Sequence, residues 1–130
     1  MSEDQRAWHA GKSFWKGEVD INSRSIGIEL DNAGSHPFSV LQMQSLVRLC
    51  RDIQQRWLIL PQSVLGHSDI SIGRKTDPGR SFDWEGLARF GIGVWPEYSP
   101  SLSPVSEEAY LKSASRIGYD VSFGLSSVLG

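Results

Sequence analysis

Two short blocks near the middle of the 130-residue chain contain the residue types that could do chemistry. Residues 66–70 read Gly-His-Ser-Asp-Ile, and residues 73–79 read Gly-Arg-Lys-Thr-Asp-Pro-Gly. An imidazole together with a carboxylate suits Zn²⁺, so His67 and Asp77 are candidates for two of the three protein ligands of a catalytic zinc ion. Lys75 is a candidate for stabilising negative charge that builds on a substrate oxygen beside such a metal. The abundance of Gly and Pro predicts a loop here rather than a helix.

The same two blocks also fit a plainer interpretation. A surface loop can contain an Asp that caps a turn and a Lys that is simply solvated, and fragments with two potential ligands are common. Spacing alone does not decide between this interpretation and a metal site.

Composition limits the classes of protein to which the chain can belong. Apolar residues make up 39% and charged residues 22%, which is typical of one globular domain. The net charge of −2 and the pI near 5.9 argue against a nucleic-acid partner, and no apolar run is long enough to span a membrane. The single cysteine, Cys50, excludes an intramolecular disulfide, and its position in an apolar stripe predicts burial.

The strongest signal for a regular element is a helix from about residue 39 to residue 56. Ser39 with Gln42 forms a capping box, and Phe38 with Met43 forms a hydrophobic staple around it. Apolar residues then recur at helical spacing on one face, namely Met43, Leu46, Val47, Cys50, Ile53 and Trp57.

The remaining elements are shorter. Residues 25–30 alternate between apolar and polar and predict a half-buried strand, and residues 63–66 predict a second strand that ends at His67. Residues 82–90 predict a short helix closed by Gly91 in the left-handed conformation. Residues 105–117 predict a helix that begins after Ser106 and ends at Gly118.

Together these blocks resemble the zinc-dependent N-acetylmuramoyl-L-alanine amidases, a bacterial family related to the peptidoglycan recognition proteins. The resemblance lies in Trp-His-Ala-Gly at residues 8–11, the 25–30 segment, the two central blocks, and Phe-Asp-Trp at residues 82–84. It implies an α/β fold, a central mixed β-sheet flanked by helices, here without its N-terminal strand or strands. It also implies hydrolysis of the amide between N-acetylmuramic acid and the first L-alanine of the peptidoglycan stem peptide.

The resemblance also assigns roles to individual residues. His67 and Asp77 match two zinc ligands of the family, and Glu29 matches the carboxylate that acts as general base on the zinc-bound water. Lys75 matches the lysine that holds the developing oxyanion. Trp8 and His9 match a block that lines the substrate groove. Without the resemblance, Glu29 reads as an exposed strand carboxylate, and His9 and His36 read as ordinary surface or turn histidines.

The chain departs from the family pattern at one important point. The family's first zinc ligand is a His upstream of the Trp-His-Ala-Gly block, and no histidine precedes Trp8 here. We therefore expect the chain to begin inside the domain, with the first ligand either absent or replaced. His9 is the nearest candidate for a replacement.

The expected organisation has three parts. Residues 1–92 form a partial amidase domain, residues 93–104 form a linker rich in Pro and Ser, and residues 105–130 resemble the start of a small helical peptidoglycan-binding module. That last resemblance favours the periplasm or cell envelope, whereas the alternative is the cytoplasm, where the recycling branch of the family lacks the module. The expected partner is peptidoglycan or a muropeptide, with no protein partner implied.

Three functions remain open from the sequence. The chain can be a zinc amidase, a muropeptide-binding protein that does not cut its ligand, or an inactive truncated amidase. The base and the oxyanion residue favour the enzyme, because a binding protein needs neither, whereas the absent first ligand favours the other two.

Overall fold

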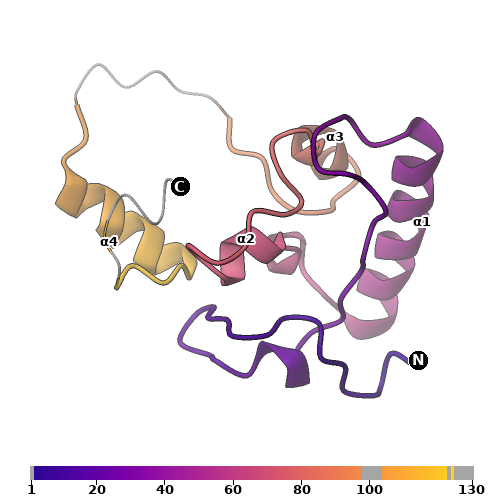
Figure 1. Ribbon diagram of the computed structural model, residues 1–130, viewed down its shortest axis with the longest axis horizontal. Helices are drawn as coiled ribbons and strands as arrows, with labels where there is room; N and C mark the ends of the chain where they lie inside the picture. Colours follow the sequence, from indigo (N-terminus) through magenta and orange to yellow (C-terminus); the bar gives the residue numbers. More distant parts are fainter. Residues whose placement is uncertain (1, 98–103, 123, 125–130) are drawn as a thin grey trace. The chain divides into compact units, whose positions relative to one another are not determined.

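The computed structural model of the chain describes residues 2–97, 104–122 and 124. Within these residues the regular elements are all helical and follow one another as shown in Figure 1. They are the 3₁₀ helix η1 (Ile21–Ser23), α1 (Val40–Trp57), the 3₁₀ helix η2 (Pro61–Ser63), α2 (His67–Ile70), α3 (Trp84–Ala88) and α4 (Glu107–Ile117).

The chain divides into two compact units. The first unit comprises the described parts of 1–29, 66–77 and 101–130, and the second comprises those of 30–65 and 78–100. All six residues that the sequence analysis assigns to a site, from Trp8 to Asp77, belong to the first unit.

Helix α1 organises the second unit. Its N-cap is Ser39, whose Oγ accepts a hydrogen bond from the Gln42 backbone N–H at 3.1 Å, as the sequence predicts. The Gln42 side chain does not complete the box, because its Nε2 donates instead to the Asp31 carbonyl at 3.1 Å. The helix ends at Trp57, one residue beyond the predicted end, and Leu58 follows in the left-handed conformation.

The core of the second unit lies between α1 and α3. Leu46 and Cys50 of α1 are buried against Leu87 of α3 and against Ile92. The predicted burial of Cys50 is therefore confirmed, and burial raises the pKa of its thiol. An edge-to-face aromatic series, Phe38 to Phe82 to Trp84, extends this core, with ring centroids 5.2 and 4.8 Å apart.

Helix α3 is shorter than the segment predicted for it. Asp83 is its N-cap, and the Asp83 side chain accepts a hydrogen bond from the Gly86 N–H. Gly91 does adopt a positive φ of 76°, as predicted, although the helix itself has already ended at Ala88.

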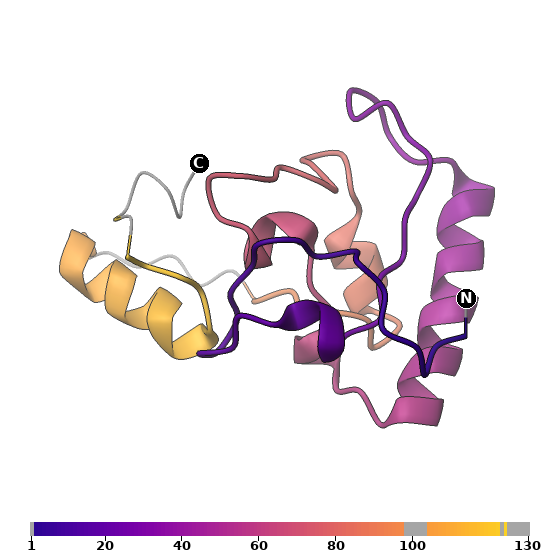
Figure 2. The same cartoon turned by 60° about the horizontal axis from the view of Figure 1, so that its bottom comes forward.

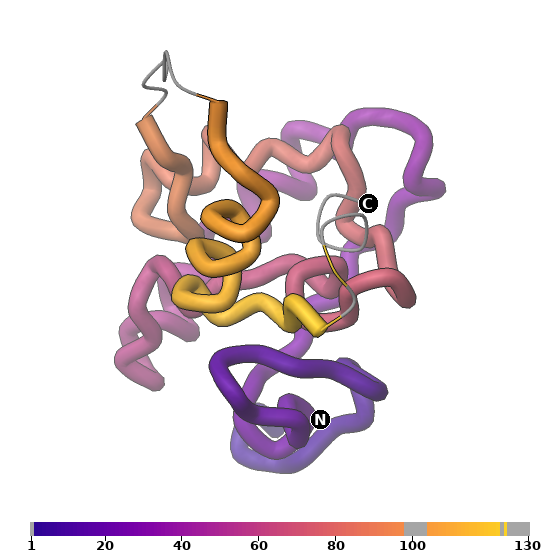
Figure 3. Tube along the Cα trace, turned by 90° about the vertical axis from the view of Figure 1, so that its left-hand side faces the viewer, coloured from indigo at the N-terminus to yellow at the C-terminus, as the bar shows by residue number. Residues whose placement is uncertain are grey.

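The first unit is held together by contacts between segments that are far apart in sequence. Phe14 N donates to the Ile70 carbonyl at 2.7 Å, and Lys16 N donates to the Gly118 carbonyl at 2.9 Å. The Trp15 and Tyr119 rings meet edge to face at 5.0 Å. Figures 2 and 3 show the yellow end of α4 running up to the indigo N-terminal segment at this place.

Helix α4 agrees closely with its prediction. Ser106 is the N-cap and accepts from the Ala109 N–H, and Gly118, at a φ of 136°, ends the helix. The predicted linker falls partly on residues 98–103, which lie outside the described residues.

The two predicted strands are not present. Residues 25–30 form no regular element, and the described residues contain only one isolated antiparallel bridge, between Trp15 and Glu18. A strand requires a neighbour to receive its backbone hydrogen bonds, and apolar alternation signals only a half-buried extended segment. The central sheet expected from the resemblance is therefore not found in the described part of the chain.

The segment before His67 is also not a strand. Pro61 begins the 3₁₀ turn η2, because its fixed φ and missing N–H suit the first residue of a helix. His67 is then the first residue of the four-residue helix α2, although the Gly and Pro content of its surroundings predicted only loop.

Among the described residues, no helix has both the length and the apolar character needed to cross a membrane.

Candidate functional site

His67 owes its position to the start of α2. The helix begins after Gly66, whose backbone N–H donates to Asp69 Oδ2 at 2.8 Å. Ser68 N donates to the Asp77 carbonyl at 2.9 Å, which ties α2 to the block that contains Asp77. Two residues ten positions apart in sequence are thereby brought side by side.

The His67 imidazole is fixed through both of its nitrogens. Nε2 lies 3.0 Å from the Ala10 carbonyl oxygen, and Nδ1 lies 3.2 Å from Asp77 Oδ2. Both neighbouring oxygens are acceptors, and a neutral imidazole has a single N–H, so a neutral His67 can donate to only one of them. In the tautomer that donates Nε2–H to the Ala10 carbonyl, the lone pair of Nδ1 points at a carboxylate oxygen, and two acceptors face each other.

This pair of atoms fits two corners of a zinc site. Two ligand atoms bound to a tetrahedral zinc ion at about 2.0–2.2 Å lie about 3.4 Å apart, close to the 3.2 Å between His67 Nδ1 and Asp77 Oδ2. A cation would also remove the mismatch between the facing acceptors. The described residues supply no group of three His, Cys, Asp or Glu side chains that could hold a metal ion, so the candidate ligands here are two and not three.

Glu29 and Lys75 belong to the same unit, and both are exposed. Lys75 follows α2 in a turn in which its backbone N–H donates to the Ser71 carbonyl at 3.1 Å. Over the described residues, neither side chain is hydrogen-bonded or ion-paired to His67 or Asp77. The structure thus brings the two candidate ligands into contact but does not join the candidate base and lysine to them.

Trp8 and His9 lie in different environments. Trp8 is 83% exposed, and the Arg6 guanidinium lies 3.9 Å from the centre of its ring. An exposed indole is suited to stacking on a flat or apolar face of a ligand.

His9 is packed into the unit. Its Nε2 lies 2.7 Å from Ser25 Oγ, and its ring covers Gly27 so closely that a Cβ there would lie 2.6 Å from His9 Cγ. Its Nδ1 is buried and has no partner among the described residues. His9 does not join His67 and Asp77 in a three-ligand group, so the structure gives no support to His9 as a replacement ligand.

Sequence reasoning missed the contacts that surround the two candidate ligands. The Ala10 carbonyl contacts His67 and also accepts from Arg74, and Tyr119 donates to Asp69 Oδ1 at 2.7 Å. Burial and the hydrogen bond to Asp69 raise the pKa of the Tyr119 hydroxyl. These hydrogen bonds span 50 to 64 residues of sequence, so no local pattern could have revealed them.

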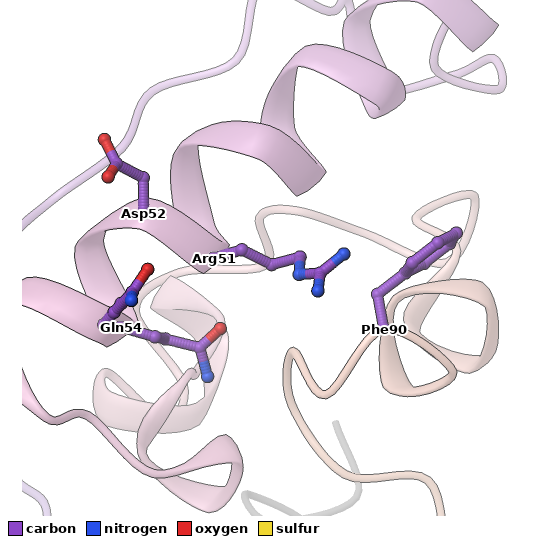
Figure 4. Close-up of a pocket in the computed structure, with 5 residues that line it drawn as sticks. Arg51, Asp52, Gln54 and Phe90 are labelled. Carbon is purple, nitrogen blue, oxygen red and sulfur yellow. The ribbon is translucent and has the colours of Figure 1, made fainter.

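A hollow elsewhere in the molecule contains none of the candidate residues. It lies in the second unit, is open to solvent, and is lined by Arg51, Asp52, Gln54, Gln55 and Phe90 (Figure 4). Its mixed polar lining includes no histidine or cysteine.

Residues 1–80 match the sequence profile of a known family, described as N-acetylmuramoyl-L-alanine amidase. The chain belongs to the N-acetylmuramoyl-L-alanine amidase family. The matched region contains all six candidate site residues. The resemblance seen in the sequence motifs is thereby confirmed.

The chain is similar to amidases of several bacteria. The chain is 40% identical to N-acetylmuramoyl-L-alanine amidase AmiD of Escherichia coli, over 93% of this chain and 50% of AmiD. It is 43% identical to 1,6-anhydro-N-acetylmuramyl-L-alanine amidase AmpD of Enterobacter cloacae, over 62% of this chain and 43% of AmpD. The chain thus spans about half the length of these two amidases.

Solved amidase structures share the fold. E. coli AmiD, in complex with anhydro-N-acetylmuramic acid-L-Ala-D-γ-Glu-L-Lys, matches 96% of this chain and 56% of AmiD, with a TM-score of 0.87 and 39% identity. AmpDh3 of Pseudomonas aeruginosa, in complex with an anhydromuramic pentapeptide, matches 96% of this chain and 56% of AmpDh3, with a TM-score of 0.81 and 32% identity.

Proposed function

We propose that this amidase-family protein is a zinc-dependent hydrolase of the amide bond between N-acetylmuramic acid and L-alanine in peptidoglycan stem peptides. The observation that carries the proposal is the contact between His67 Nδ1 and Asp77 Oδ2 at 3.2 Å. Its separation suits two ligands of one tetrahedral zinc ion, and the two residues lie in the region that matches the family.

His67 and Asp77 would hold the metal in this proposal. When bound, zinc supplies a Lewis acid that makes hydroxide available near neutral pH. The protein's own contribution at this point is to present one neutral nitrogen and one anionic oxygen together, with the remaining His67 nitrogen already bonded to the Ala10 carbonyl.

Glu29 would transfer a proton, and Lys75 would stabilise the negative charge that forms on the substrate. The Glu29 carboxylate accepts the proton of the attacking water and passes it to the leaving L-alanine nitrogen. The Lys75 Nζ stabilises the oxyanion that forms from the amide carbonyl. Both side chains are exposed, and so both are available to a substrate that lies on the first unit.

The proposed substrate is a muramyl peptide. Trp8, 83% exposed, offers an apolar face for the sugar or the stem peptide, and His9 lies next to it. Solved relatives hold anhydro-muramyl peptides, which supports this chemical class. The cell envelope or periplasm is the proposed location and the cytoplasm the alternative, since relatives of both the AmiD and the AmpD type are similar to the chain.

A second candidate function is binding of muramyl peptide without cleavage. The observation that favours it is that the described residues supply two ligands for a metal and not three. A chain that holds zinc weakly would keep the exposed Trp8 surface but lose turnover.

The deciding experiment incubates the zinc-loaded protein with anhydro-N-acetylmuramyl-L-Ala-D-Glu peptide and follows released peptide by mass spectrometry. We expect release that stops with chelator, with Glu29→Gln slower by about 10²–10⁴-fold and Lys75→Ala by about 10²–10³-fold. Glu85→Gln, in the second unit, is the matched control. Binding of the peptide without any release would establish the second candidate and overturn the first.

A further inference from the structure

The Arg74 side chain makes more hydrogen bonds than its exposed position would suggest. Its Nη2 lies 2.7 Å from the Ala10 carbonyl, 2.8 Å from the Lys12 carbonyl and 2.9 Å from Ser71 Oγ. Its Nε donates to the Lys12 carbonyl at 3.1 Å. A single guanidinium therefore connects the N-terminal segment with the loop that contains Lys75 and Asp77.

One of these acceptors is the carbonyl that binds His67. A carbonyl oxygen has two lone pairs, and the Ala10 oxygen uses them for Arg74 Nη2 and for His67 Nε2. The Ala10 residue is also held through its own N–H, which donates to Asn22 Oδ1 at 2.8 Å, and Ala10 is 1% exposed. The acceptor that faces His67 thus has very little freedom to move.

Gly11, which lies between the Ala10 and Lys12 carbonyls, passes very close to the Arg74 guanidinium. Gly11 has a φ of 62°, and a Cβ at this position would lie 3.0 Å from Arg74 Nη2. The planar guanidinium has several N–H donors and can bind two carbonyls at once, whereas the ammonium of a lysine is a compact group with its donors on one nitrogen. Arg74 and Gly11 therefore together fix the positions of the Ala10 and Lys12 carbonyls.

We propose that Arg74 is a positioning residue: it holds the Ala10 carbonyl where that carbonyl takes the Nε2 proton of His67, which reserves Nδ1 for the metal. The proposal rests on the proposed role of His67 as a ligand. A residue that orients a ligand in this way typically changes metal affinity by about 10–100-fold when it is lost. Arg74 touches neither the metal nor the substrate in this scheme.

The first test is made on the metal-free, unmutated protein. At a pH where His67 is neutral, ¹⁵N NMR of its ring distinguishes the two tautomers. We expect a protonated Nε2 with an observable N–H hydrogen and an unprotonated Nδ1. A spectrum in which Nδ1 carries the proton overturns the proposal, and this test does not depend on whether any variant folds.

The second test compares variants. Arg74→Ala should lose the Nε2–H signal, shift both His67 nitrogens towards tautomer-averaged values, and bind zinc about 10–100-fold more weakly. Arg74→Lys should give His67 shifts and a zinc affinity between those of the unmutated protein and Arg74→Ala. Gly11→Ala should disturb the same His67 signals while keeping the charge of Arg74. Arg24→Ala, at an exposed arginine of the same unit that pairs with Glu18, is the control and should leave His67 unchanged.

The results separate this inference from the function on which it rests. Unchanged His67 shifts and unchanged zinc affinity in Arg74→Ala overturn the positioning role of Arg74. If the unmutated protein binds no zinc, the amidase proposal fails, while the His67 spectra still decide whether Arg74 sets the tautomer.

Discussion

At the scale of single residues, the site depends on side chains that fix the candidate ligands. The sequence made His67 and Asp77 candidate ligands, and the structure brings their side chains within 3.2 Å of each other. The roles of all six candidate residues, His67 and Asp77 included, stay predictions. The sequence could not identify the Ala10 carbonyl as the partner of His67, because a backbone oxygen 57 positions away has no signature in the sequence.

A first prediction concerns the contact between His9 and Gly27. Gly27→Ala would introduce a Cβ only 2.6 Å from His9 Cγ, well inside van der Waals contact. We expect a loss of about 1–3 kcal/mol in the free energy of unfolding, because the ring must shift and its hydrogen bond to Ser25 must break. Thermal and urea unfolding measure the loss.

The double variant provides the control for this prediction. Adding His9→Ala removes the ring that the new methyl group meets, so the two losses should be clearly less than additive. Additive losses would mean that Gly27 is required for another reason, such as the conformation of its own backbone.

A second prediction uses the buried hydroxyl of Tyr119. Its pKa is raised above the usual value of 10.0, chiefly by burial and then by Asp69, so the folded protein keeps this proton longer than the unfolded chain does. The contribution of the protonated Tyr119 hydroxyl to the stability of the folded protein is therefore fully present below about pH 10 and is lost as the pH rises above it. Tyr119→Phe should unfold more easily at neutral pH, by about 1 kcal/mol, and should lose part of the alkaline sensitivity.

Parallel unfolding series from pH 7 to pH 11 on the two proteins measure this effect. Asp69→Asn removes the charge that faces the hydroxyl and should weaken the alkaline dependence in the same direction. Identical pH dependence in Tyr119→Phe and the unmutated protein would show that the hydroxyl is not buried against Asp69.

At the scale of elements, the helices were predictable and the strands were not. The signals for α1 and α4 are local: an N-cap serine in both, a periodic apolar face in α1, and a glycine after the last turn of α4. A strand instead depends on a partner elsewhere in the chain, so alternation at residues 25–30 could not establish that one is present. Helix α2 escaped prediction because it is only four residues long and its N-cap, Gly66, has no side chain to signal the start of a helix.

The third prediction tests the cap of α1. Ser39→Ala removes the acceptor for the Gln42 N–H and should lower the stability of the second unit by about 1 kcal/mol. Ser39→Asp keeps an acceptor and should restore it. Hydrogen exchange of the amides in the first turn of α1 measures the effect locally, and equal exchange in all three proteins would contradict it.

At the scale of the whole molecule, the division of the chain remains a proposal. We propose an amidase portion over residues 1–92, a linker over 93–104, and the start of a peptidoglycan-binding module from 105. The described part of the C-terminal segment nevertheless contacts the portion that contains the site, through Gly118 with Lys16 and through Tyr119 with Asp69. Helix α4 therefore contributes to the unit in which His67 lies.

The measurement that tests the central claim most directly is zinc binding by calorimetry to the purified, metal-free chain. The account predicts about one zinc per chain, with affinity falling at least about tenfold in His67→Ala and in Asp77→Ala, since each removes a ligand. His36→Ala and Asp31→Ala, both in the second unit, are the matched controls and should bind as the unmutated protein does. Zinc affinity that is undetectable, or that is unchanged in His67→Ala and Asp77→Ala, would contradict the account.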